Sequence, residues 1–248
     1  MNDLLAIPDK PRIGVSACLA GEAVRYDGDH QQHRQVVGLL AKLFELIPIC
    51  PEVEIGLGIP REPIQLEQTG TVTRLIGIES RTDHTGPMQD FSQHTASQLE
   101  AWQACGYVLK SKSPSCGLQH VKRVDESGAF ERDGQGIFAA GLQQHVPGLP
   151  LVEEVALEED SARQHFIARV EAFHRLRTCL AAPWDPAQMI NFHVAHRQLL
   201  ESHHQTGCWQ LERHVALIGE QEAGSFRARY RHQFLQIMAH PVEPSSPG

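Results

Sequence analysis

The chain has 248 residues and a formal net charge of −8, with 41% apolar and 21% charged residues. These proportions are those of a folded globular protein, and they exclude a disordered chain. No run approaches the ~18 consecutive apolar residues of a membrane span, and the N-terminus lacks a basic segment followed by an apolar one. We therefore expect a cytoplasmic protein with no membrane partner.

Composition divides the chain into two parts. Residues 1–159 carry 13 Lys and Arg against 22 Asp and Glu, whereas residues 160–248 carry nine Arg, no Lys and eight Asp and Glu. The second part also holds nine of the fifteen His residues. This shift predicts two domains, over residues 9–157 and 160–240, and a Pro- and Ser-rich tail at 241–248 that we expect to be disordered.

The first part alternates short apolar runs, typical of buried strands, with segments whose apolar residues recur at helical spacing. Strands are predicted at 12–18, 46–50, 72–80, 106–110 and 150–155. Helices are predicted at 31–45, 88–104 and 136–146. Turn residues predict a hairpin after the loop that contains Cys116. This alternation predicts βαβ units, and so a Rossmann-like α/β domain whose mainly parallel sheet has helices on both faces.

The second part contains only helical patterns. Apolar residues recur at helical spacing in four segments, at 161–180, 185–203, 209–218 and 226–238. The sequence therefore predicts a small all-α domain behind the α/β domain.

Three cysteines share one position relative to the predicted strands. Cys18 ends the first strand, Cys50 ends the second, and Cys116 lies in the loop after the strand at 106–110. Because the carboxyl ends of parallel strands lie along one edge of a sheet, we expect the three thiols to meet in one crevice there. Three converging cysteines are typical of a metal or cluster site.

The number of thiols bears on which metal they would hold. Structural zinc takes four ligands, often from Cys-x2-Cys pairs, and the chain has no such pair. A cubane iron–sulfur cluster normally takes four thiolates, so three would leave one iron open to a substrate, for which sulfur is a natural soft ligand. The other cysteines, Cys105, Cys179 and Cys208, are expected to pack as small hydrophobic residues.

A carboxylate lies beside the second of these cysteines. Glu52 follows Cys50 by two residues. A carboxylate next to a cluster can activate water or move a proton, which makes Glu52 a candidate catalytic residue. It could equally be a solvated surface charge.

Other polar residues near the cysteines are candidates for contacts with a substrate. Lys110, Ser111 and Ser113 precede Cys116, and serine hydroxyls can donate to or accept from a bound molecule. Tyr26, in the loop after the first strand, is a further candidate. The alternative for the serines is a Ser-Pro turn that only shapes the loop.

The segments VSACLAGEAVRYDG, PICPEVEIGLGIPREPIQL and LKSKSPSCG together resemble the bacterial thiouracil desulfidase family, over about residues 12–155. The resemblance implies a [4Fe-4S] cluster held by three cysteines, with the fourth iron free to take the sulfur of the substrate.

The cluster ligands that the resemblance implies are Cys18, Cys50 and Cys116. It implies a catalytic glutamate at Glu52, and a catalytic serine three residues before the third cysteine, at Ser113.

The run NFHVAHRQLLESHHQTGCWQLERHVA, at 191–216, resembles a second family, a helical domain often fused behind the first. Two positions depart from its pattern, with Glu212 where glycine is usual and Cys208 where an aromatic residue is usual. The chain ends before that domain normally does, so a shortened domain is expected. Fusions of the two domains resemble tRNA thiouridine desulfidases, which convert 4-thiouridine in tRNA to uridine.

The arginine-rich second part fits an RNA partner, because guanidinium groups suit phosphate recognition and base stacking. Arg163 and Arg177, on the first predicted helix of that part, are candidate contacts, with a solvated helix face as the alternative. A net charge of −8 requires that a basic groove face the RNA. We expect tRNA as the partner, and no DNA.

The predicted function is therefore a [4Fe-4S]-dependent, net hydrolytic desulfidase of 4-thiouridine in tRNA that releases sulfide. One alternative keeps the chemistry and acts on free thiouracil or thiouridine. A second is a non-enzymatic iron–sulfur sensor that binds RNA or protein, and a third is a zinc-stabilised binding module.

Overall fold

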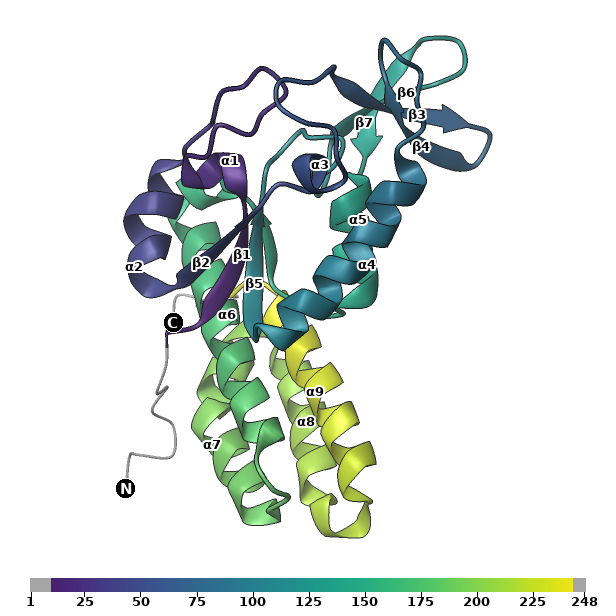
Figure 1. Ribbon diagram of the computed structural model, residues 1–248. Helices are drawn as coiled ribbons and strands as arrows, with labels where there is room; N and C mark the ends of the chain where they lie inside the picture. Colours follow the sequence, from purple (N-terminus) through teal and green to yellow (C-terminus); the bar gives the residue numbers. More distant parts are fainter. Residues whose placement is uncertain (1–9, 243–248) are drawn as a thin grey trace, which may run out of the picture. The chain divides into compact units, whose positions relative to one another are not determined.

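The computed structural model describes residues 10–242, which divide into two compact units, Lys10–Asp160 and the residues from Ser161 onward (Figure 1). The tail expected at 241–248 lies, from residue 243 on, outside the described residues. No helix among the described residues is long and apolar enough to span a bilayer.

The first unit is built on a four-stranded sheet, sheet A, in which all neighbours are parallel. In spatial order its strands are β2 (Glu45–Ile49), β1 (Arg12–Ser16), β5 (Ala104–Leu109) and β8 (Leu151–Glu153). All six residues of β5 are buried, as expected for a central parallel strand that is covered on both faces. The predicted α/β class with a parallel sheet is confirmed.

Helices cover both faces of sheet A (Figure 1). A π-helical turn (Val36–Leu40) leads into α2 (Ala41–Leu43) on one side. The long helix α4 (Thr85–Ala101) and α5 (Ile137–His145) pack against each other on the other side. The buried residues of α4, which include Met88 and Leu99, form the apolar stripe that holds it there.

A second four-stranded sheet, sheet B, was not predicted. Its order is β4 (Val72–Gly77), β3 (Ile64–Thr69), β6 (Val121–Val124) and β7 (Phe130–Gly134). The β6–β7 hairpin confirms the predicted one, and β4 confirms most of the strand at 72–80. Strand β3 was missed because its sequence, IQLEQT, has only two apolar residues, which are too few to establish a strand period.

Two short helices follow the first two strands directly. Helix α1 (Ala17–Ala20) contains Cys18, so the first strand ends at Ser16 and the prediction of a strand up to residue 18 was wrong there. Helix α3 (Pro51–Glu54) begins immediately after Cys50, which is its N-terminal cap residue, with proline in its first turn.

The second unit consists of helices packed side by side (Figure 1). They are α6 (Asp160–Ala181), α7 (Pro186–His203), α8 (Gln205–Ala216) and α9 (Ala223–Ala239). The four predicted helices are confirmed. Helix α8 begins four residues earlier than predicted because the His204 ring accepts a hydrogen bond from the Gly207 amide at 3.2 Å and caps the helix.

Histidines form part of the core of the helical unit. His193 and His196 are each 4% exposed. The His193 ring lies 3.2 Å from the Tyr230 hydroxyl, and the His196 ring stacks on Phe192. Cys208 is fully buried, as expected for a packing cysteine. These partners make the histidines core residues and explain their spacing without a metal.

Candidate functional site

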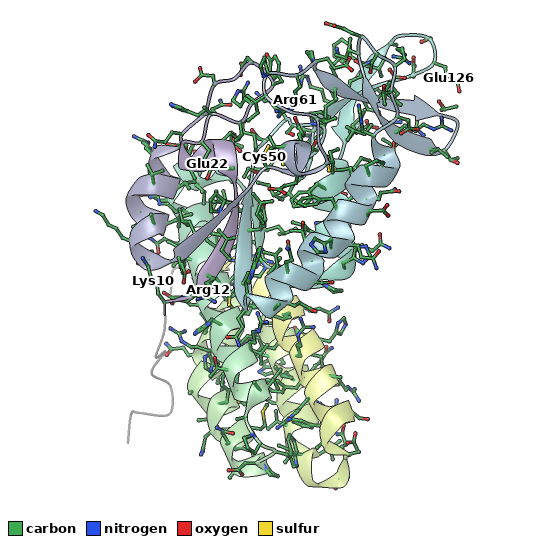
Figure 2. All side chains as sticks on the ribbon, viewed as in Figure 1. Lys10, Arg12, Glu22, Cys50, Arg61 and Glu126 are labelled. Carbon is green, nitrogen blue, oxygen red and sulfur yellow. The ribbon has the colours of Figure 1, made fainter. Side chains whose placement is uncertain are left out.

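The carboxyl ends of β1, β2 and β5 open into a cavity of about 550 Å³, within the usual size range of ligand sites. Cys18, Cys50 and Cys116 all line it. In Figure 2, Cys50 lies beside α3, and Arg61 lies on the loop beyond it. The structure therefore brings together the three thiols that the sequence predicted to meet at this edge of the sheet.

Local hydrogen bonds set the position of Cys116. The Ser113 hydroxyl oxygen accepts hydrogen bonds from the amides of Ser115, at 3.2 Å, and Cys116, at 3.1 Å. The loop also packs tightly on the start of α5, since a Cβ atom at Gly136 would lie 2.3 Å from the Ser115 carbonyl oxygen. Glycine at this position therefore allows the cysteine loop and the helix to meet.

Burial keeps the three cavity thiols protonated in the absence of a metal. It raises the pKa of Cys18 to about 11, with a further contribution from Cys50. It also raises the pKa of Cys50 and, more strongly, that of Cys116. The three thiols are free, and none forms a disulfide. Such thiols lose their protons when a cation binds, which is the usual behaviour of a metal site.

The number of donors in the cavity favours a cluster over a single zinc ion. Structural zinc takes four protein ligands. No fourth cysteine and no histidine lines the cavity among the described residues. A set of three thiols without a further cysteine or histidine ligand fits a cubane cluster with one open iron, whose thiolates bind different irons.

Tyr107 of β5 places a buried hydroxyl near the cysteines. Its ring lies over Gly14 of β1, where a Cβ atom would come within 2.2 Å of a ring carbon. The hydroxyl has no hydrogen-bond partner within residues 10–242. Burial raises the pKa of Tyr107, and the three cavity cysteines raise it further. The Tyr107 hydroxyl therefore lies close enough to the three cysteines to interact with them electrostatically. An unpaired donor beside three thiols fits a sulfur-rich group, because hydrogen bonds to cluster sulfurs are common.

Glu52 is held on both of its oxygens. Arg61 donates to Oε2 from Nε at 2.9 Å and from Nη2 at 2.7 Å, and Ser115 donates to Oε1 at 2.9 Å. The two charged side chains are 4% exposed for Arg61 and 14% for Glu52. Arg61 also donates to the carbonyls of Gly58 and Val24, so it joins the loops that follow the first two cysteines.

A second buried ion pair lies on the other side of the cavity. Lys110 donates to Glu154 at 2.5 Å, and the Ser111 amide and hydroxyl donate to the same carboxylate at 2.6 and 2.8 Å. Glu154 is only 4% exposed. This network fixes the cation of Lys110 at the cavity wall.

A group of metal-ligand type in the helical unit has a different explanation. Glu201, Cys208 and Glu212 come within 4.8 Å of one another. Arg197 forms ion pairs with both carboxylates, at 3.0 and 2.6 Å. The arginine therefore already pairs with both carboxylates and offsets half of their charge.

Residues 13–154 match the model of a protein family described as 2-thiouracil desulfurase. The chain belongs to this family. The uncharacterized protein YbbK of Bacillus subtilis (strain 168) is 30% identical over 135 residues, which are 52% of this chain and 88% of that protein. The solved structure of a [4Fe-4S]-dependent thiouracil desulfidase, TudS, shares 30% identity, spans 60% of this chain and 94% of that one, and has a TM-score of 0.49. The family match lies within the first unit.

Most of the residues singled out in the sequence line one cavity. Besides the cysteines they are Tyr26, Glu52, Lys110, Ser111 and Ser113. Tyr26 is 44% exposed, with the Arg25 guanidinium 5.6 Å from its ring centre. The roles of these residues stay predictions.

Arg163 and Arg177 lie on α6 of the helical unit, and their role in binding a substrate also stays a prediction. Sequence reasoning missed Arg61 altogether. The available signal was an arginine between two prolines, in the Gly-rich loop that follows Glu52.

Proposed function

We propose that the protein is a [4Fe-4S]-dependent desulfidase that converts 4-thiouridine in tRNA to uridine. The observation that carries the proposal is a single cavity in which three thiols, without a fourth cysteine or a histidine from residues 10–242, face a carboxylate held on both oxygens. Membership of the 2-thiouracil desulfurase family supports a thiolated pyrimidine as the substrate. The overall reaction replaces the C=S group by C=O. Water supplies the oxygen, and the sulfur leaves as hydrogen sulfide.

A cluster held by Cys18, Cys50 and Cys116 would supply an open iron that acts as a Lewis acid toward the thiocarbonyl sulfur. Glu52 is the base that takes a proton from the attacking water. Its Oε2 already accepts two hydrogen bonds from Arg61, whereas Oε1 accepts one from Ser115 and keeps a free lone pair. Oε1 is therefore the atom that receives the proton.

Ser113 and Lys110 contact the substrate from the opposite loop. Both acceptor positions of the Ser113 oxygen are used by backbone amides, which leaves its own O–H to donate into the cavity. That hydroxyl can hydrogen bond to a ring nitrogen or oxygen of the base. Lys110, fixed by Glu154, provides a positive charge that favours the anionic product of C–S cleavage.

The tRNA part of the proposal is supported by the helical unit, whose only basic side chains besides histidine are arginines. Free thiouracil or thiouridine is the second candidate, because the family match covers only the first unit.

The test is anaerobic reconstitution with iron and sulfide, followed by incubation with tRNA that contains 4-thiouridine. About four irons and four sulfides per chain, with sulfide release from the tRNA, are expected. Parallel reactions with free 4-thiouridine and 2-thiouracil compare the substrates. A chain that retains no iron would overturn the cluster, and turnover of the free compounds alone would favour the second candidate.

A further inference from the structure

One face of sheet B carries an exposed aromatic ring between two cations. Phe130 of β7 is 55% exposed. The Lys122 ammonium lies 4.7 Å from the centre of its ring, and the Arg132 guanidinium lies 6.0 Å from it. Both cations are exposed, and neither forms an ion pair within the described part of the chain. An exposed aromatic ring with a cation on each side is an uncommon arrangement on a surface strand.

The strand register extends this face across the sheet. Phe130 pairs with Val124, which pairs with Glu67, which in turn pairs with Arg74. Residues opposite one another in a ladder point to the same side, so these side chains share one face. Leu66 alternates with Glu67 and is fully buried, so it belongs to the opposite, core-facing side.

Two cations on this face have no carboxylate partner within residues 10–242, although the chain as a whole is acidic. Two further cations lie here, but each faces a carboxylate: Arg81 pairs with Glu67 at 2.6 Å, and Arg74 lies 3.9 Å from Asp83. Lys122 and Arg132 are the two cations on this face that have no carboxylate partner among the described residues. An exposed aromatic ring with an unpaired cation on each side complements a single-stranded nucleic acid, which supplies phosphates and flat bases together.

Strand β3 begins at the cavity, but its first residue points to the same side as Leu66, so the face that carries Phe130 lies on the other side of the strand and an RNA would reach the cavity around the end of β3. Ile64, the first residue of β3, lines the cavity. Three residues along the strand and two strand spacings across the sheet separate Ile64 from Phe130, which gives about 14 Å from ordinary sheet dimensions. An RNA strand that passes around the end of β3 would need more than about four stacked nucleotides, at 3.4 Å each, to cover this separation.

We propose that this face of sheet B binds a single-stranded segment of the RNA whose thiolated base enters the cavity. A base stacks on Phe130, and phosphates lie beside Lys122 and Arg132. The inference rests on the proposed function in taking RNA as the partner, and adds the surface on which the RNA lies.

The experiment measures binding of the full chain to unmodified tRNA by fluorescence anisotropy, at several salt concentrations. Phe130→Leu removes the ring, and Phe130→Trp keeps one. Lys122→Gln combined with Arg132→Gln removes the two cations. Lys10→Gln combined with Lys42→Gln removes two exposed cations elsewhere in the same unit and is the matched control.

Loss of one stacked base should weaken binding about 5- to 150-fold in Phe130→Leu, without changing the salt dependence. Phe130→Trp should bind like the wild type. The Lys122/Arg132 variant should reduce the slope of log K against log salt by about 1.4, since each phosphate contact to a single strand contributes about 0.7. The control variant should keep the wild-type slope.

The proposal is overturned if the wild type binds no tRNA, or if Phe130→Leu binds within twofold of it and the Lys122/Arg132 slope is unchanged. Sulfide release from free 4-thiouridine by the wild type tests the proposed function separately. If the wild type turns over the nucleoside but does not bind RNA, the RNA-binding role of sheet B is refuted and the desulfidase activity is supported. If RNA binds through Phe130 but no desulfidation occurs, the RNA-binding role of sheet B is supported and the desulfidase activity is refuted.

Discussion

Replacing Arg61 by methionine should destabilise the first unit strongly. The substitution keeps most of the side-chain volume and removes the guanidinium that donates twice to Glu52. With the two side chains 4% and 14% exposed, little water can replace those donors. Removing one partner of a buried ion pair typically costs about 3–5 kcal/mol, because the other charge stays buried without compensation.

A double-mutant cycle with Glu52→Gln isolates this interaction. Each single variant leaves one charge unpaired, whereas the double variant leaves neither, so it should lose less stability than the sum of the single variants. We expect a coupling energy of about 2–3 kcal/mol. Amide hydrogen exchange in β1 and β5 reports the free energy of opening of this unit alone, which matters in a chain of two units.

Arg74→Met is the matched control, because Arg74 is 52% exposed and lies 3.9 Å from Asp83. An exposed ion pair of this kind contributes about 0–1 kcal/mol. The proposed role of this network is contradicted if the losses of unfolding free energy in Arg61→Met and Glu52→Gln add up, within about 0.5 kcal/mol, to the loss in the double variant. It is also contradicted if Arg61→Met destabilises the unit no more than Arg74→Met does.

Four further predictions concern the cluster ligands, the catalytic base Glu52, the unpaired hydroxyl of Tyr107 and the helical unit. Cys50→Ala should lose most of the iron bound on reconstitution, whereas Cys179→Ala should retain it; equal iron contents would contradict the ligand assignment. Glu52→Gln should retain the iron and lower the rate of sulfide release about 10²–10⁴-fold, and wild-type turnover would exclude it as the base. Tyr107→Phe should raise the unfolding free energy of the iron-free protein by about 1 kcal/mol, because a buried hydroxyl without a partner is removed; exchange rates in β5 measure this, and a loss of stability would mean that the hydroxyl is paired. Burial lowers the pKa of His193 below its ordinary 6.5, so the folded state holds it neutral while the unfolded chain takes up a proton in acid. The unfolding free energy of the helical unit should therefore be fully present above about pH 6.5 and decrease as the pH falls toward the lowered value, seen as faster opening of α7 at about pH 5 than at about pH 7.5.

The parallel sheet and its cysteine edge could be predicted because both depend on local patterns. The strands of sheet A are short apolar runs, and the helices between them have a clear helical period. Once parallel strands are inferred, their carboxyl ends share an edge whatever the details of packing. Cys50 and Cys116 were therefore placed together correctly, although Cys18 lies in a short helix and not at the end of its strand.

Sheet B could not be predicted from local sequence patterns in this way. Strand β3 carries three polar side chains in its first five residues, and its strand identity depends on its partners, β4 and β6. The exposed ring of Phe130 and the cations around it become a surface only when four strands lie side by side.

The chemical detail of the cavity was decided by the tertiary structure. The sequence by itself determined that three thiols and Glu52 lie at one edge of the sheet, since each follows a strand of that sheet. It did not determine that Ser115 hydrogen bonds to Glu52 while Ser113 supports the backbone of the cysteine loop. Nor did it reveal Arg61, because a charge can be buried only where folding supplies both a carboxylate and free carbonyls, and those partners come from the segment before Arg61 and from the distant loop that contains Val24.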